Sequence, residues 1–259
     1  VSNVKDKYFL NAIDIMLFKH LKLVTFDVTN TLLKFKVPPW QTYGELARNY
    51  GFTGENETLS KRFVDRYKYM LAKYPNFGKN THLTWEDWWR EIVRYTFKDQ
   101  IPVSSNIDII ATQLINKYKS KDSWTCVEGG VKLLNMLQEQ QILIGVISNF
   151  DPRLHEILRN INLEKYFKFI LTSYEVGFSK PDRRIFDHAL KKCEKEISPN
   201  MCLHIGDDFD KDYEGAKRAG WHALLVTNDG KPCHDKNTVP SLQELIHAIE
   251  KNAISLSNR

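Results

Sequence analysis

This sequence has few cysteines, and they show none of the spacings typical of metal sites or redox pairs. The 259 residues include only Cys126, Cys193, Cys202 and Cys233, without a CxxC pair or a Cys/His ligand spacing. A disulfide framework and a zinc site are therefore not expected. We expect reduced thiols in an intracellular protein.

Long apolar runs are also absent. None approaches the ~20 residues that a membrane helix needs, and Asp14 and Lys19 interrupt the apolar residues near the N-terminus. No small-residue cleavage site follows, so we expect no secretory signal. These absences predict a protein that does not bind membranes and that is located in the cytoplasm. They do not exclude a location in the nucleus or in mitochondria.

Strong charge of one sign is missing too. Lys+Arg 37 against Asp+Glu 32 leaves a net charge of +5, without a long basic run. This balance fits a small anionic substrate and argues against a nucleic-acid partner. It predicts no particular oligomeric state. Repeats and low-complexity segments are absent, and 259 residues suffice for one large or two moderate domains.

Short apolar segments, each followed by polar residues or glycine, predict five β-strands. These cover residues 21–27, 142–148, 167–172, 202–205 and 222–227. Helical periodicity fills residues 130–140, 152–161, 182–195, 210–219 and 241–251. Asp182 and Asp210 are candidate helix N-caps, and Gly220 is a candidate helix stop. The alternation predicts an α/β fold with a Rossmann-like, doubly wound parallel sheet.

Residues 38–118 break this alternation, because their patterns are helical throughout. The expected helices are 42–50, 57–73, 84–97 and 105–118. An all-helical insert after the first strand would lie over the carboxyl ends of the strands, where open α/β sheets bind ligands. The predicted domains are an N-terminal extension (1–19), a core (20–37 and 119–251), a helical cap (38–118) and a C-terminal tail (252–259).

Two local features refine this organisation. The chain begins with Val1, and Met16 lies just before the first predicted strand. We expect translation to start at Met16 and residues 1–15 to have no role in the fold. In the cap, Trp85, Trp88 and Trp89 share one helix face. We expect them to pack between cap helices, with a lid that touches substrate as the alternative.

Chemically active side chains follow four of the predicted strands. In chain order they are Asp27; Ser148 and Asn149; Ser179, Lys180, Pro181 and Asp182; and Gly206, Asp207, Asp208 and Asp212. Because the carboxyl ends of parallel strands share one edge of a sheet, these groups would meet in one crevice. Four strands ending in this way form a much stronger signal than one.

The motifs FDVTNTL, VISN, SKPD and GDDFDKD, in this order, resemble those of the haloacid dehalogenase-like hydrolase superfamily. The resemblance covers about residues 20–250, including the position of the cap. The segments VISNFDPRL, PNFG, WEDWW and SYEVGFSKPDRRIF are also similar to one animal subgroup of the superfamily. The resemblance implies hydrolysis at a strand-end aspartate.

The resemblance and the chemistry of these side chains together suggest their roles. Asp27 would be the nucleophile and would form an aspartyl-phosphate. Lys180 would offset the repulsion between this carboxylate and a phosphate dianion. The Ser148 hydroxyl and the Asn149 backbone N–H would donate hydrogen bonds to phosphate oxygens.

The implied cofactor is Mg²⁺, which prefers hard oxygen ligands. Asp27 and Asp207 are the side-chain ligands that the resemblance implies, with the backbone carbonyl of Thr29 as a third. Asp208 and Asp212 would bind the metal directly, bind it through water, or hold Lys180. The sequence does not choose among these roles.

Thr29 stands where phosphatases of this superfamily carry an aspartate that acts as general acid and base. Losing such a group costs roughly 10²–10⁴ in rate. Three interpretations remain: a slow phosphatase, a non-catalytic member that binds a phosphorylated ligand or a partner, and a metal-independent 2-haloacid dehalogenase. Asp207 and Asp208 argue against the last, because they would repel a carboxylate substrate. We predict a Mg²⁺-dependent hydrolase of small phosphate esters that is slow on poor leaving groups.

Two more residues carry expectations. Asn30 replaces the glycine common in this motif, and asparagine tolerates the left-handed backbone conformation that the turn needs. His204 lies inside the fourth predicted strand. We expect it to pack in the core and not to act as a base.

Overall fold

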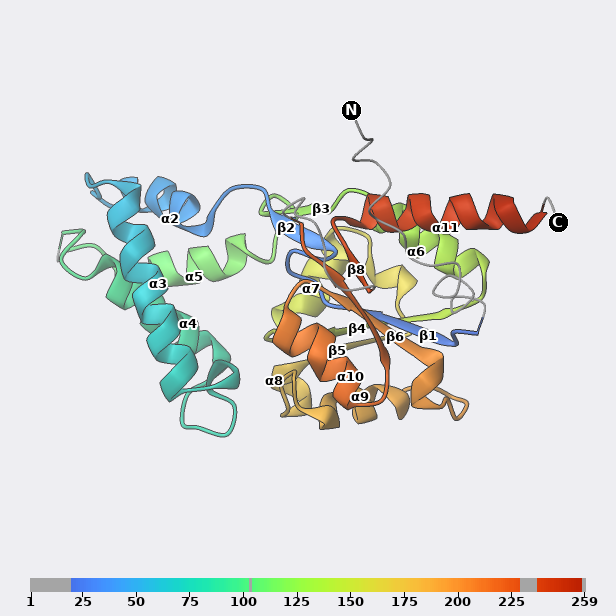
Figure 1. The fold of residues 1–259 in the computed structure, drawn as a ribbon. Coiled ribbons are helices and arrows are strands. Elements are labelled where there is room, and N and C mark those ends of the chain that lie inside the picture. Colours follow the sequence, from blue (N-terminus) through green and yellow to red (C-terminus); the bar gives the residue numbers. More distant parts are fainter. Residues whose placement is uncertain (1–19, 103, 229–236, 258–259) are drawn as a thin grey trace, which may run out of the picture.

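The computed structural model of the chain describes residues 20–102, 104–228 and 237–257 (Figure 1). The predicted N-terminal extension, Met16 and Cys233 lie outside this part. Within it, no helix is both long enough and apolar enough to cross a membrane.

A six-stranded sheet forms the centre of the core, in the order β5-β4-β1-β6-β7-β8. Its strands are β1 (Leu23–Phe26), β4 (Leu143–Ser148), β5 (Phe169–Thr172), β6 (Cys202–Gly206), β7 (His222–Val226) and β8 (Thr238–Val239). Every pairing is parallel. All four residues of β1 are buried, as expected for a central strand covered on both faces. The predicted doubly wound α/β sheet is confirmed, and β8 is an unpredicted edge strand.

Helices cover both faces of this sheet (Figure 1). One hydrophobic cluster joins the sheet to α6 (Gly130–Glu139), α7 (Arg153–Asn160) and α11 (Leu242–Ser257). A second cluster, on the other face, joins it to α9 (Arg183–Leu190) and α10 (Gly215–Arg218). The shorter elements are η3 (Glu164–Tyr166), α8 (Ser173–Val176), η4 (Pro199–Met201) and the π-helical turn η5 (Phe209–Glu214).

Several helix ends differ from the prediction. Asp182 caps α9 as expected, since its side chain accepts the Arg184 backbone N–H at 2.9 Å. The helix ends at Leu190, before a run of mostly exposed charged residues with few apolar anchors. Asp210 is not a cap, because η5 already begins at Phe209 and is capped by Asp208. Helix α11 runs to Ser257, into the predicted tail, because no glycine or proline interrupts that segment.

The cap is a separate layer of helices beside the core (Figure 1). It consists of α2 (Pro39–Arg48), α3 (Asn56–Lys73), η2 (Asn76–Gly78), α4 (Trp85–Phe97) and α5 (Ile107–Lys117). Two clusters hold it together, one around Tyr43 and Phe97 and one around Met70 and Trp88. Trp88 is fully buried between cap helices, as expected from its position in the tryptophan cluster.

A short two-stranded ribbon joins cap and core. Strand β2 (Leu33–Phe35) pairs antiparallel with β3 (Trp124–Cys126), so the chain enters and leaves the cap at adjacent points. The Phe35 and Trp124 rings stack at 4.2 Å between centroids. The sequence did not predict this ribbon, because each strand has three residues of which only one is fully buried.

Candidate active site

The expected strand-end residues meet beneath the cap. Asp27 follows β1, Ser148 ends β4, Asp207 follows β6, and Lys180 lies in the loop between α8 and α9. All four line one cavity of about 580 Å³, and residues of the cap, the ribbon and the core form its other walls. The cavity therefore lies at the carboxyl ends of the strands, where open α/β sheets bind their ligands.

Lys180 is buried between two carboxylates, with only 3% of the residue exposed. Its Nζ lies 2.7 Å from Asp27 Oδ1, 2.6 Å from Asp212 Oδ1 and 2.7 Å from the Ile147 carbonyl oxygen. An ammonium group has three N–H donors, and these contacts match them. Burial alone would lower the pKa of Lys180, but the Asp212 and Asp27 carboxylates outweigh it and raise this pKa. The ammonium group therefore stays charged.

The Asn149 side chain fixes the loop that carries Lys180. Asn149 Oδ1 accepts the Lys180 backbone N–H at 2.7 Å, and Nδ2 donates to the Lys180 carbonyl at 2.8 Å. The sequence drew attention to the Asn149 backbone N–H and missed this side-chain role. These hydrogen bonds link residues that are 31 positions apart in the sequence. A local sequence pattern does not predict such a long-range contact.

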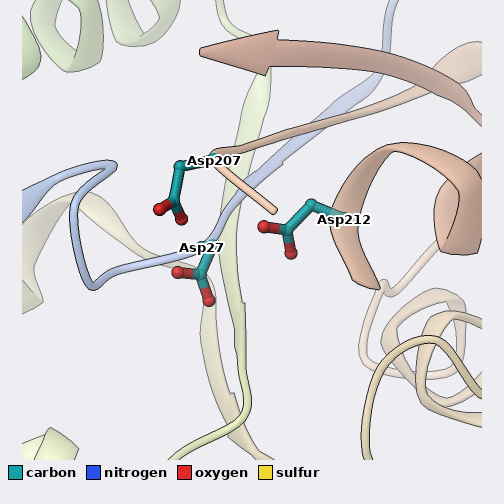
Figure 2. A group of neighbouring side chains, drawn as sticks. All are labelled: Asp27, Asp207 and Asp212. Carbon is teal, nitrogen blue, oxygen red and sulfur yellow. The ribbon is translucent and has the colours of Figure 1, made fainter. Parts of the chain in front are cut away.

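Asp27, Asp207 and Asp212 form an acidic group in which the three carboxylates lie close together (Figure 2). One ligand oxygen from each lies within 4.8 Å of the others. Burial raises the pKa of Asp27 to about 6, partly opposed by Lys180 and reinforced by Asp212 and Asp207. Burial and Asp212 also raise the pKa of Asp207. Since three carboxylates face one ammonium group, a divalent cation would relieve their repulsion, and their hard oxygens fit Mg²⁺.

Asp212 is held by several donors. Its Oδ1 contacts Lys180 and also His204 Nε2 at 3.1 Å, while Oδ2 accepts the Asp208 backbone N–H at 3.0 Å. Burial alone would raise the pKa of Asp212, but Lys180 and His204 lower it well below its usual range. This carboxylate therefore keeps its charge.

His204 packs in the core, as expected for a strand residue, and is fully buried. Its Nδ1 lies 2.8 Å from Thr25 Oγ1, while its Nε2 reaches Asp212. Burial lowers the pKa of His204, so the ring is neutral. The sequence did not reveal its link to the acidic group, which crosses from β6 to η5.

Asp208 is the expected metal-site residue that the structure does not bring into the acidic group. Its Oδ1 accepts the Lys211 backbone N–H at 2.9 Å, and its Oδ2 pairs with the Lys211 ammonium group. Burial would raise the pKa of Asp208, but the hydrogen bonds from Lys211 outweigh it and lower this pKa. The Asp208 carboxylate therefore caps the N-terminus of η5.

The turn after β1 positions Thr29 in the cavity wall. The next residue, Asn30, has φ 60°, so the predicted left-handed conformation is confirmed. Asn30 Nδ2 lies 3.4 Å from Asp207 Oδ2, and Thr31 Oγ1 lies 3.5 Å from Asp207 Oδ1. Thr31 is fully buried and was not singled out from the sequence. These contacts tie the turn to the acidic group.

A buried ion pair of the core contacts tryptophans of the cap. Arg153 donates to Asp151 from Nε at 2.9 Å and from Nη2 at 2.7 Å. Trp89 Nε1, from the cap, donates to Asp151 Oδ2 at 2.8 Å. The Arg153 guanidinium lies over the Trp85 and Trp89 rings, 5.3 and 4.8 Å from their centroids. Trp89 therefore contacts the core and lines the cavity, unlike Trp88.

Comparisons with known proteins identify the family of this chain. The family model of haloacid dehalogenase-like hydrolases matches residues 21–220. The rhythmically expressed gene 2 protein of Drosophila melanogaster is 37% identical over 252 residues, which cover 90% of this chain and 96% of that protein. Haloacid dehalogenase-like hydrolase domain-containing protein 3 of Mus musculus is 33% identical over 240 residues, or 89% of this chain and 94% of that one. These are the animal subgroup that the motifs resemble.

Solved structures share the fold. The HAD-hydrolase YfnB from Bacillus subtilis, described as bound to magnesium, superposes with a TM-score of 0.68 at 19% identity, covering 89% of this chain and 99% of that one. Haloacid dehalogenases at 21% and 16% identity and a phosphatase at 19% share it too. The fold therefore does not choose between these activities. The family match and the strand-end site together show that this chain belongs to the haloacid dehalogenase-like hydrolases.

Proposed function

We propose that the protein is a Mg²⁺-dependent phosphatase of small phosphate esters, with Asp27 as the nucleophile. The observation that carries this proposal is the 2.7 Å contact between Asp27 Oδ1 and the buried Lys180 Nζ in the wall of the cavity. An anionic nucleophile approaches a phosphate dianion only where positive charge lies between them. Asp27, Asp207 and Asp212 would hold the ion, and bound Mg²⁺ would supply two further positive charges.

The chain's own residues account for phosphoryl transfer. An Asp27 oxygen forms a bond to phosphorus while the ester P–O bond breaks, and the electron pair leaves with the alcohol oxygen. Lys180 neutralises charge on the transferring group, and the Ser148 hydroxyl donates to a phosphate oxygen. Water then attacks phosphorus, which breaks the bond to Asp27 and releases inorganic phosphate. The alcohol takes a proton from solvent, and the attacking water loses one to solvent.

Thr29 makes both halves of this reaction slow. A threonine hydroxyl neither protonates an alkoxide nor deprotonates water at neutral pH, so poor leaving groups lose the general acid–base contribution. Dehalogenation would avoid this need, because halide leaves without a proton. The acidic group argues against it, since Asp207 and Asp212 would repel a carboxylate substrate beside Asp27.

Thr29 also motivates the second candidate, a non-catalytic protein that binds a phosphorylated ligand or partner. Hydrolysis of 4-nitrophenyl phosphate separates the two, because this leaving group needs little acid assistance. We expect turnover with Mg²⁺, loss of turnover with a chelator, and loss in Asp27→Asn. No turnover by a protein that calorimetry shows to bind Mg²⁺ would favour the binding protein. Turnover that survives in Asp27→Asn would contradict the proposed nucleophile.

A further inference from the structure

The cap side of the cavity is uncharged and rich in aromatic rings. Among the described residues, no cap residue that lines the cavity carries a charge. Six aromatic side chains contribute to this wall: Tyr43, Phe63, Tyr67, Phe77, Trp89 and Tyr118. A ligand group that binds against this wall would therefore be selected mainly by its contact with aromatic rings.

The rings form a continuous surface. Tyr43 and Phe63 have centroids 5.3 Å apart, Phe63 and Tyr67 5.9 Å, and Tyr67 and Trp89 6.1 Å. Trp89 and Phe77 follow at 6.2 Å. These spacings are those of packed aromatic neighbours, so the wall presents ring faces and edges along its length.

The charged core residues near this wall are already paired. Arg153 is bound to Asp151, and Lys211 is bound to Asp208. In the described part of the cavity lining, the remaining charged groups are Asp27, Lys180, Asp207 and Asp212, which gather at the strand ends. The cavity thus has one charged end and one uncharged end that is rich in aromatic rings.

We propose that the aromatic wall binds the alcohol part of the substrate, and that this part is an uncharged group with an aromatic ring or a comparable apolar surface. The inference rests on the proposed phosphatase function. At about 580 Å³, the cavity lies in the range of about 300–1,000 Å³ typical of sites for drug-sized ligands. Among the described lining residues of this wall, a second anionic group would lose its hydration without gaining an unpaired cation.

Phosphonates test the proposed binding of the alcohol part without turnover. They carry a carbon–phosphorus bond in place of the ester bond, so the enzyme cannot hydrolyse them as phosphate esters. Calorimetric titration with Mg²⁺ would compare benzylphosphonate with methylphosphonate. We expect benzylphosphonate to bind at least tenfold more tightly. Equal affinities would overturn the inference and leave the phosphate site intact. Failure of both to bind would overturn the inference and the proposed function together.

A pair of tyrosine variants localises the effect. Tyr67→Ala removes a ring from the wall, and we expect the preference for benzylphosphonate to fall at least threefold, with methylphosphonate affinity unchanged. Tyr67→Phe should retain the preference. Tyr95→Ala is the control, because Tyr95 is also in the cap but 41% exposed and outside the cavity lining. A full preference in folded Tyr67→Ala would contradict binding at this wall.

Discussion

Lys180 is one ammonium group shared by two carboxylates, 2.7 Å from Asp27 and 2.6 Å from Asp212. The two carboxylates respond in opposite ways. Burial raises the pKa of Asp27 to about 6, whereas Lys180 and His204, against the effect of burial, lower the pKa of Asp212. Without a cation, the ionised Asp27 carboxylate is therefore the least stable charge of the group. As the proposed nucleophile, it would be kept reactive at the expense of folding stability.

Asp27→Asn should therefore stabilise the metal-free protein at pH 7.5. The folded pKa of about 6 lies above the ordinary value of 3.8, so the folded state binds the proton more tightly. Wild-type stability should fall as pH rises between these values, and the variant should lack this fall. We expect a gain of about 1–3 kcal/mol at pH 7.5, measured by urea unfolding with a chelator. Asp212→Asn should instead lower the free energy of unfolding at pH 7.5. A loss of stability in Asp27→Asn at this pH would contradict this account.

Thr29→Asp should restore the missing general acid–base. We expect alkyl phosphate turnover to rise by roughly 10²-fold or more, with little change for 4-nitrophenyl phosphate, because only the alkoxide needs the proton. Thr29→Asn is a control of similar size that transfers no proton, and it should give no such gain. Steady-state kinetics on both substrates provides the measurement. Equal changes for the two substrates would remove this explanation of Thr29.

Secondary-structure elements differ in how far the sequence alone predicts them. Strands β1, β4 and β6 are almost entirely buried, so their apolar runs were visible and their bounds differ little from the prediction. The edge strand β8 and the ribbon strands β2 and β3 have two or three residues with mixed burial. Their pairing comes from the tertiary arrangement, which leaves no periodicity in such short segments.

The same distinction holds for the site. The strand-end rule was enough to bring together Asp27, Ser148 and Asp207. It could not separate Asp208 from Asp207, because the direction of these adjacent side chains depends on how η5 begins. The side-chain roles of Asn149 and His204 arise from contacts across loops and strands, and sequence spacing does not encode these.

Alanine variants of the adjacent aspartates test the role given to η5. Asp208→Ala removes its N-cap and should cost about 0.5–2 kcal/mol, with Mg²⁺ affinity nearly unchanged. Asp207→Ala should lower Mg²⁺ affinity by roughly tenfold or more, with little loss of stability. Calorimetric titration with Mg²⁺ and urea unfolding measure both quantities. The reverse pattern would place Asp208 among the metal ligands.

In the whole molecule, several contacts connect the cap to the core. The β2–β3 ribbon joins them covalently, and the Trp89–Asp151 contact with Arg153 joins them through side chains. Asn76 Nδ2 adds a bond to the Ser173 carbonyl at 2.8 Å. The two side-chain contacts must break if the cap moves away from the core, whereas the ribbon stays connected.

The Asp151–Arg153 pair should be important to this arrangement. Asp151→Ala leaves a buried guanidinium without its carboxylate and should cost about 3–5 kcal/mol in urea unfolding. Trp89→Phe keeps a ring but removes the indole donor, and should cost only about 1 kcal/mol. Matching small losses in both variants would show that the ion pair contributes little.

The ribbon also bears on how proteins of this architecture diversify. The Lys36 backbone N–H donates to the Ser123 carbonyl at 3.0 Å, so the two ends of the cap segment are adjacent. Topologically, the whole cap is the loop of one hairpin. A loop with closed ends can be exchanged between related genes without altering the strand register behind it. Selection can therefore remodel what such an enzyme recognises while the reacting groups are inherited unchanged.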